Sequence, residues 1–268
     1  MTAVDVVKAS LYLTYSWYKN NRVMLAMSLL WPYLMAFLVL ALGSMYGSLS
    51  EFTRRMGVSN PVLYMLASST VAFSSIAILE AAVGFVMYNR WLGTLQYIVL
   101  SPVKSKTLIA VAGIPDSMIS AVVSVTAVAP AAAYFEGLHG ALKAIAVLLL
   151  ILAGMTPMLA FSVIAAAATL SVREETNVLA FLNPLILLLS GVFYPIEVLP
   201  RLLQLASKAV PSKYVIDAAK LVATYTTPEG KLLMLALYPL AALAVAYNLI
   251  ALAGVDKAVS LAKRRGFE

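Results

Sequence analysis

The sequence predicts an all-α integral membrane protein with six transmembrane helices. Hydrophobic residues make up 62% of the chain and charged residues only 12%, against about 25% charged residues in soluble domains. Runs of about 20 or more nearly uncharged residues recur along the chain, each long enough to cross about 30 Å of hydrocarbon as a helix. Composition and block pattern together therefore predict a single transmembrane domain over residues 1–268, not a soluble enzyme.

The basic residues fit a membrane better than a nucleic acid partner. The formal net charge is +7, but the lysines and arginines stand singly at the edges of apolar runs and form no patch with interleaved aromatics. The chain has no cysteine and a single histidine, His139, which argues against thiolate chemistry and a nitrogen-rich metal site. We therefore predict no nucleic acid partner, no catalytic residue, and no metal or cofactor held by this chain.

Six apolar runs are long enough, or nearly so, to be read as membrane spans. Several approach thirty residues, so we expect them to tilt or to project from the membrane. The fifth is short and carries Asn183-Pro184, which predicts a break inside the outer leaflet. The predicted spans are Val23–Tyr46, Pro61–Tyr88, Thr107–Phe135, Ala141–Leu170, Val178–Phe193 and Leu232–Val255.

The distribution of basic residues predicts that both ends of the chain lie in the cytosol. With a cytosolic N-terminus, eleven of the 19 lysines and arginines fall on the inside. Five of the other eight belong to one half-apolar segment, Ile196–Lys231, so the remaining bias favours this orientation. An even number of spans then returns Lys263-Arg264-Arg265 to the cytosolic face, beside anionic lipid.

Residues 1–22 are predicted to form an interfacial helix on the cytosolic surface of the membrane. The apolar residues of this segment recur at helical spacing, whereas its charged residues lie elsewhere on the helix. The alternative is an extension of the first span. The apolar positions are Val4, Val7, Leu11, Tyr15 and Tyr18.

A second segment, residues 89–102, is predicted to form a short cytosolic helix between the second and third spans. Leu92, Leu95 and Val99 recur at helical spacing, and Pro102 discourages continuation of the helix. From its residues alone this segment is either a docking helix for another protein or an amphipathic loop that lies on lipid.

The third segment, residues 194–231, is predicted to form two short outer helices. Pro195, Pro200 and Pro211 divide it into two amphipathic stretches. Irregular backbone is tolerated at membrane depth only where it packs against protein or faces water. We therefore expect helices that cap the outer face or form a re-entrant hairpin with the end of the fifth span.

Two motifs resemble the permease subunits of type-2 ATP-binding-cassette (ABC) transporters, a group of drug, polysaccharide and lipid exporters. The first is Arg90-Trp91-Leu92-Gly93-Thr94-Leu95 with Leu100-Ser101-Pro102, which is similar to the cytosolic coupling segment of that family. The second is Ser190-Gly191-Val192-Phe193-Tyr194-Pro195, followed by Leu199-Pro200 and Pro211-Ser212-Lys213-Tyr214, which is similar to the outer gate region. The two motifs occur in order and the resemblance covers essentially the whole chain.

The resemblance implies a subunit that exports a hydrophobic, amphipathic or lipid-linked substrate across the cell membrane. The chain lacks the Gly-rich loop that cradles nucleotide phosphates, so ATP and Mg²⁺ are expected on a separate ABC ATPase subunit, present in two copies. A second permease chain, identical or similar, is expected to complete a dimer in the lipid bilayer. The resemblance assigns ATPase coupling to Asn89, Arg90, Trp91, Leu92, Gly93, Thr94, Leu95, Ser101 and Pro102, and the outer gate to Gly191, Tyr194, Pro195, Pro200 and Pro211.

Glu80 and Asp116 are the only acidic residues inside predicted spans. An acid there costs roughly 2.5–3.5 kcal/mol on insertion scales, so some interaction must offset the cost. The two residues either line a polar pathway or hydrogen-bond to structural serines and to the helix around Pro115. The small residues at 43–47 and Ala165–Ala168 likewise serve either internal packing or a dimer contact.

Two other classes of function compete with an ATP-driven exporter. An ion-gradient-driven secondary transporter without an ATPase partner usually has inverted repeats and ion-coordinating groups near the midplane, and the sequence has no visible repeat. An intramembrane enzyme needs convergent catalytic side chains at one depth, for which only Glu80 and Asp116 are available.

Overall fold

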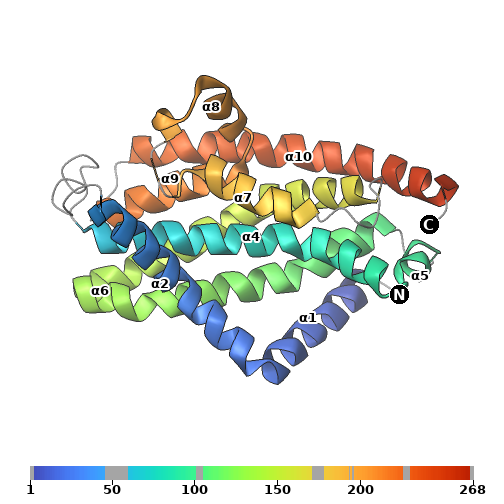
Figure 1. The fold of residues 1–268 in the computed structure, drawn as a ribbon, viewed down its shortest axis with the longest axis horizontal. Coiled ribbons are helices and arrows are strands. Elements are labelled where there is room, and N and C mark those ends of the chain that lie inside the picture. The colour runs from blue at the N-terminus through green and yellow to red at the C-terminus, as the bar shows by residue number, and fades with distance from the viewer. Residues whose placement is uncertain are drawn as a thin grey trace.

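The computed structural model describes residues 3–45, 60–100, 105–170, 178–192, 194, 196–225 and 230–265. Within these ranges all regular structure is helical (Figure 1). The α-helices are α1 (Ala3–Asn20), α2 (Arg22–Met45), α4 (Pro61–Trp91), α5 (Leu95–Leu100), α6 (Ser105–Thr169), α7 (Val178–Ser190), α8 (Arg201–Ser207), α9 (Pro211–Thr224) and α10 (Gly230–Arg265), and η1 (Ile196–Val198) is a 3₁₀ helix.

Three described helices, α4, α6 and α10, are long and apolar enough to cross a membrane. A fourth span results if α1 and α2, which meet at 91°, count as one bent span. Helix α7 is apolar but has only 13 residues. The all-helical membrane class is therefore confirmed, with three to four candidate spans, whereas the predicted count of six stays a prediction.

Helix α6 is interrupted at Gly137, where φ is 60° and ψ is −135°. The two halves fold back on each other (Figure 1), so the 65-residue helix is a hairpin. A side chain at Gly140 would collide with the carbonyl oxygen of Ala132, so this close approach requires glycine. The break falls in the turn that the sequence predicts between residues 135 and 141.

The ends of the bundle are distinct. Helix α5 and both chain ends lie at one end, called here the α5 end, and the bend of α6 lies at the opposite end, called the Gly137 end (Figure 1). The cytosolic orientation predicted for both termini and for residues 89–102 stays a prediction.

Helix α4 lies at the centre of the fold and packs against α2, α6, α7 and α9. Its Ile78, Ala82 and Val83 have no exposed surface. Small hydroxyl side chains join it to its neighbours: the Ser74 and Ser124 hydroxyls lie 2.7 Å apart, and Ser162 Oγ donates to the Leu79 carbonyl at 2.6 Å. Such small polar residues let helices approach closely and bond across their interface without water.

Helices α1 and α2 form an elbow beside α6. The Tyr18 hydroxyl at the end of α1 lies 3.4 Å from Ser120 Oγ, and Tyr33 of α2 donates to the Ala127 carbonyl at 2.5 Å. The predicted N-terminal helix is therefore present, but its C-terminal end reaches the middle of the first half of α6. Its Val4 and Tyr15 are each 60% exposed, so an apolar side is available for lipid.

Helix α7 runs through Pro184 without a break and ends at Ser190. The break expected at Asn183-Pro184 is thus absent, because packed membrane helices tolerate proline where neighbouring groups satisfy the freed backbone. The helix nevertheless stops early, as its short apolar run predicts.

Candidate functional site

The connection between α4 and α5 is a tight turn centred on Gly93. Its φ of 70° places Gly93 in the left-handed region, which glycine adopts at little cost. The Gly93 N–H donates to the Arg90 carbonyl at 2.9 Å and the Thr94 N–H to the Asn89 carbonyl at 2.8 Å. These paired bonds are the Schellman motif that terminates a helix and satisfies its last carbonyls.

Side chains reinforce this turn. Asn89 donates through Nδ2 to the Phe85 carbonyl at 2.8 Å, and Thr94 Oγ1 bonds Asn89 Oδ1 at 2.8 Å. The single helix expected over residues 89–102 is instead divided: Asn89–Trp91 complete α4, and only Leu95–Leu100 form α5. The physical reason is the left-handed glycine between them. Ser101 and Pro102 lie outside the described residues.

An exposed aromatic surface surrounds this turn. Trp91 is 81% exposed, Tyr97 69% and Tyr88 60%, and the rings of Tyr88 and Trp91 lie 6.4 Å apart. Leu92 is 47% exposed, whereas Leu95 is only 4% exposed and packs into the core of this chain. Tyr88, Trp91, Leu92 and Tyr97 are called the aromatic surface below.

Arg90 ties the end of α4 to the end of α6. Its guanidinium donates to the Thr169 carbonyl at 2.9 Å, in the last turn of α6. Helix C-termini carry unpaired carbonyls and a partial negative charge, so a cation there is favourable. The α4–α5 turn is thus joined both to α4, which it continues, and to the second half of α6.

The motif that resembles the outer gate region, within residues 190–214, is called here the outer motif. It contains another glycine in the left-handed region near its start. Gly191 has φ of 74° and follows the end of α7. A side chain at this position would press on Ile196 Cγ1 at 2.9 Å, so the close approach of η1 also favours glycine. The Tyr194 hydroxyl donates to the Leu188 carbonyl at 2.9 Å, which returns the chain onto α7.

Two prolines of the outer motif mark the starts of helices. Pro200 precedes α8 at its N-cap position and Pro211 stands in the first turn of α9, where the missing proline N–H is not needed. Pro195 lies outside the described residues. The two predicted short helices are therefore present.

These helices do not cap the Gly137 end. Helix α8 projects from the flank of the bundle (Figure 1). Helix α9 packs against α4, α6 and α10, with Ile216, Ala218 and Ala219 completely buried. Burial of the apolar face of α9 against these helices is more favourable than leaving that face exposed at the end of the molecule. A side chain at Gly154 of α6 would collide with Val215 of α9.

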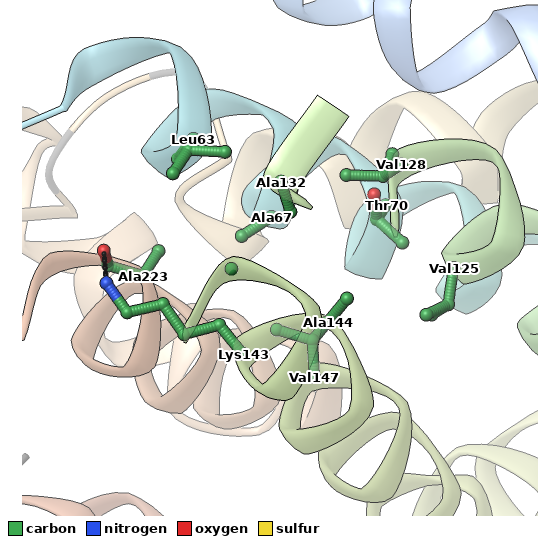
Figure 2. A pocket seen from close by; sticks show the side chains of 11 residues that line it. Leu63, Ala67, Thr70, Val125, Val128, Ala132, Lys143, Ala144, Val147 and Ala223 are labelled. Atoms are coloured by element: carbon green, nitrogen blue, oxygen red, sulfur yellow. Dashed lines mark hydrogen bonds between the residues drawn. The ribbon is translucent and has the colours of Figure 1, made fainter. Parts of the chain in front are cut away.

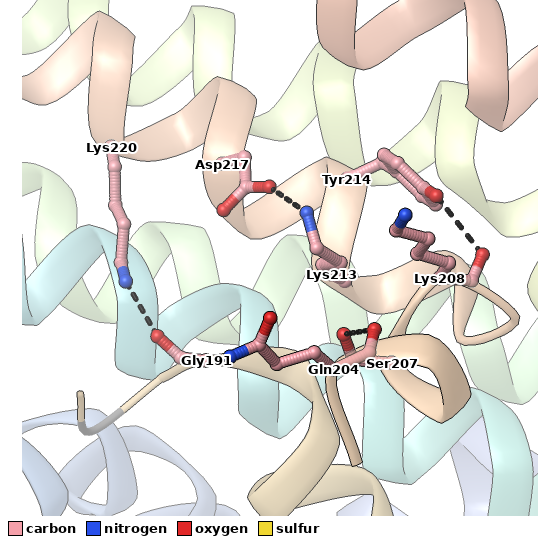
Figure 3. A network of polar contacts seen from close by, with 8 residues as sticks. All are labelled: Gly191, Gln204, Ser207, Lys208, Lys213, Tyr214, Asp217 and Lys220. Carbon is pink, nitrogen blue, oxygen red and sulfur yellow. Dashed lines mark hydrogen bonds and ion pairs between the residues drawn. The ribbon is translucent and has the colours of Figure 1, made fainter. Parts of the chain in front are cut away.

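Lys220 of α9 joins the two parts of the outer motif (Figure 3). Its Nζ donates to the Gly191 carbonyl at 2.5 Å and lies 5.1 Å from the centre of the Tyr64 ring of α4. Burial lowers the pKa of Lys220 to about 8, although nearby Asp217 and Glu197 act in the opposite direction. The contact therefore holds α4, α9 and the end of α7 together.

A neighbouring cluster fixes α9 to its surroundings, as Figure 3 also shows. Lys213 and Asp217 form an ion pair at 2.7 Å on one face of α9. The Tyr214 hydroxyl donates to the Lys208 carbonyl at 3.0 Å. Burial raises the pKa of Tyr214, so its hydroxyl stays protonated and able to donate at neutral pH.

Lys143 of α6 contacts the C-terminal end of α9. Its Nζ donates to the Ala223 carbonyl at 3.0 Å and pairs with Glu136 at 2.7 Å. Figure 2 shows Lys143 extended toward Ala223 along a cavity of about 30 Å³ between α4, α6 and α9. That volume has room for about one water molecule, so this cavity does not hold a substrate.

The two membrane acids lie near each other but differ in setting. Glu80 is exposed on α4, and its Oε1 accepts from Asn183 Nδ2 of α7 at 2.6 Å. Asp116 of α6 is partly buried and close enough to Glu80 to interact electrostatically. Glu80 thus has an amide partner rather than a serine, and Pro115 causes no break in α6.

Sequence reasoning missed three of these side chains, Lys220, Lys143 and Asn183. Lys220 stands in an otherwise apolar stretch of α9, and a cation in such a stretch needs nearby acceptors. That signal was available, but its partner Gly191 is 29 residues away and depends on the fold. Among the described residues no cluster of three or more potential metal ligands occurs.

Comparison with known proteins gives one family. The family model for the ABC-2 type transporter matches residues 13–222, a region that includes both motifs. A search of curated protein sequences finds no match. Because the matched region spans most of the chain and its described helices are membrane-type, this protein belongs to the ABC-2 type transporter family as a membrane permease component.

Proposed function

We propose that this chain is the transmembrane permease subunit of an ATP-driven exporter, and that it moves a hydrophobic, amphipathic or lipid-linked substrate outward across the cell membrane. The observation that carries the proposal is the α4–α5 turn with its aromatic surface. Large exposed aromatic side chains at one end of the bundle are suited to contact another protein, because tryptophan and tyrosine are enriched among the residues that dominate binding energy.

The turn is suited to transmit motion. It is closed by backbone and side-chain hydrogen bonds and is joined by Arg90 to the end of α6. A force applied to the aromatic surface would therefore move α4 and α6 together, as rigid elements. In this proposal Trp91, Leu92 and Tyr97 contact an ABC ATPase subunit, Asn89, Gly93 and Thr94 shape the turn, and Arg90 and Leu95 anchor it.

In this proposal α5 lies on the cytosolic side, where the ATPase is found. Two ATPase subunits carry ATP and Mg²⁺, and two permease chains form the translocation unit. Six spans, with both termini and α5 in the cytosol, put the outer motif on the far side. Gly191, Tyr194, Pro195, Pro200 and Pro211 then shape an outer gate, which Lys220 holds against α4.

The test is association with an ATPase encoded by an adjacent reading frame. Trp91→Ala combined with Tyr97→Ala is expected to abolish co-purification of that ATPase and to return its ATP hydrolysis to the rate of the isolated subunit. Leu138→Ala removes an equally exposed side chain, 77% exposed at the Gly137 end, and is expected to change neither. Unchanged association in the double variant, or transport that needs only a proton gradient, would contradict the proposal.

A further inference from the structure

A groove of about 470 Å³ lies between the two halves of α6 and helix α10, on the half of the bundle nearer the α5 end. The described residues that line it are apolar apart from Thr156 of α6 and Asn248 of α10, and none of them is charged. Small-molecule sites usually have this form, an apolar pocket of a few hundred Å³ with a small number of polar groups. The groove shares no residue with the α4–α5 turn or the outer motif.

The groove is reached from the hydrocarbon of the membrane. Leu252 at its edge is 62% exposed, and the span of α10 is only 11% buried, so the groove opens on the surface that lipid covers. Asn248 lies six residues before Gly254, where that span ends, which is about 9 Å at helical rise. A charged group at that depth is costly without a charged partner. The part of a ligand that faces Asn248 is therefore uncharged.

The two polar residues of the groove retain hydrogen-bonding capacity. Asn248 Nδ2 donates to the Ala244 carbonyl at 2.8 Å, which leaves the amide oxygen Oδ1 as an acceptor. Thr156 is exposed on α6, and its hydroxyl makes no hydrogen bond within the described chain. Polar groups that face hydrocarbon without a partner are unfavourable. A ligand with a donor and an acceptor is therefore favoured here over a plain hydrocarbon chain.

Thr156 and Asn248 lie at the same end of the groove. On the second half of α6 the groove extends from Met155 to Val163, and on α10 from Asn248 to Leu252. Both segments run toward the α5 end (Figure 1), so the polar pair stands at the end farther from α5 and the rest of the lining is apolar. From Thr156 to Val163 this apolar part is about 10 Å long at helical rise, which suits an alkyl chain of medium length.

We propose that the groove between α6 and α10 binds one uncharged, membrane-soluble molecule with an apolar body and a terminal hydroxyl group. The hydroxyl group of the ligand donates to Asn248 Oδ1 and accepts from the Thr156 hydroxyl. The apolar body lies along the remainder of the groove, where Ala110, Ala160 and Ala251 leave space for it. The bound molecule joins the hairpin of α6 to α10. The inference does not rest on the proposed transport function.

The test uses the purified permease in lipid nanodiscs and a diazirine-labelled octanol, with octane and octanoate labelled in the same way as matched probes. Mass spectrometry identifies the labelled peptides. The octanol probe is expected to label the groove segments of α6 and α10 saturably and to be displaced by unlabelled octanol, and the other two probes to label them about fivefold less. Equal and non-saturable labelling by octanol and octane would overturn the proposal. So would absence of labelling by all three probes, the result expected if a second copy of the chain covers the groove.

Variants of the polar pair test the hydrogen bonds. Thr156→Val combined with Asn248→Leu is expected to raise the half-saturating concentration of octanol about 25-fold, from about fivefold for each lost hydrogen bond, and to leave labelling by octane unchanged. Thr156→Ser keeps the hydroxyl and is expected to bind octanol as wild type does. Asn21→Leu removes the same kind of intrahelical amide bond outside the groove and is expected to have no effect.

A variant that fills the groove tests its location. Ala251→Trp is expected to abolish saturable labelling, whereas Ala246→Trp, at an exposed position of α10 outside the groove, is expected to retain it. Saturable labelling that survives Ala251→Trp, or that the double variant of the polar pair leaves unchanged, would contradict the site. Because no ATPase is present and no transport is measured, these results leave the transport proposal untouched.

Discussion

The charged form of Lys220 makes two favourable contacts but is disfavoured by burial. One carbonyl oxygen and one aromatic ring face its ammonium, while burial disfavours its charged form. A cation held this way keeps its position only while Gly191 and Tyr64 stay in place. Movement of α9 away from α4 would break the contact with Tyr64, and movement of α9 away from the end of α7 would break the bond to Gly191.

The lowered pKa of Lys220 makes stability depend on pH. The folded protein binds this proton with a pKa of about 8 and the unfolded chain with 10.5. Between these values unfolding takes up a proton, so the free energy of unfolding rises as pH increases from about 8 to 10.5. Below pH 8 this residue contributes no pH dependence, because both states are protonated.

The measurement is thermal unfolding of wild type and Lys220→Met at several pH values. The stability of wild type relative to Lys220→Met is expected to increase from pH 8 to 10.5 and to be constant between pH 6 and 7.5. Lys208→Met, at an exposed lysine, is the control and is expected to parallel wild type. A difference that falls with rising pH would contradict the assignment.

Asn183 is the side chain that offsets the cost of Glu80 in the membrane. Its amide donates to Glu80 Oε1 at 2.6 Å and so joins α7 to α4. Asn183→Ala is expected to lower the free energy of unfolding by about 1 kcal/mol. Glu80→Gln keeps an acceptor and is expected to cost less. Transport that is lost in Glu80→Gln while stability is retained would instead favour the polar pathway.

At the scale of elements, the turn between α4 and α5 is determined by both backbone and side-chain interactions. Its geometry needs a left-handed residue at position 93, two backbone hydrogen bonds and the Asn89–Thr94 contact. The motif that resembles the coupling segment thus contains the residues that build the turn, and the aromatic surface is displayed by it. The same residues therefore define both the sequence motif and the backbone turn.

Gly93→Ala tests this connection. A side chain in the left-handed conformation costs about 1 kcal/mol or more, so the free energy of unfolding is expected to fall by that amount and ATPase association to weaken. Gly84→Ala is the matched control, since Gly84 lies within α4 with open space around it. There alanine is expected to raise stability by up to about 1 kcal/mol. Equal effects at both positions would refute the role of the turn.

At the scale of the whole molecule, periodicity and hydropathy predict the class of fold and the position of most helices. They succeed because each long apolar run must be helical in lipid. They fail where a tertiary contact or a local backbone conformation decides: Gly93 divides residues 89–102 into the end of α4 and α5. The partners of Lys220 and Asn183 lie far away in sequence, so no local pattern reveals them.

The chain contains no cysteine, so a single introduced thiol reports on one position without background. Trp91→Cys and Leu138→Cys place thiols at opposite ends of the bundle, on highly exposed residues. Treatment of intact cells with a membrane-permeant thiol-to-amine cross-linker is then the most direct test of ATPase docking at the α5 end. We expect Trp91→Cys to cross-link to a nucleotide-hydrolysing protein and Leu138→Cys not to. Cross-links to such a protein from position 138 alone would contradict the account.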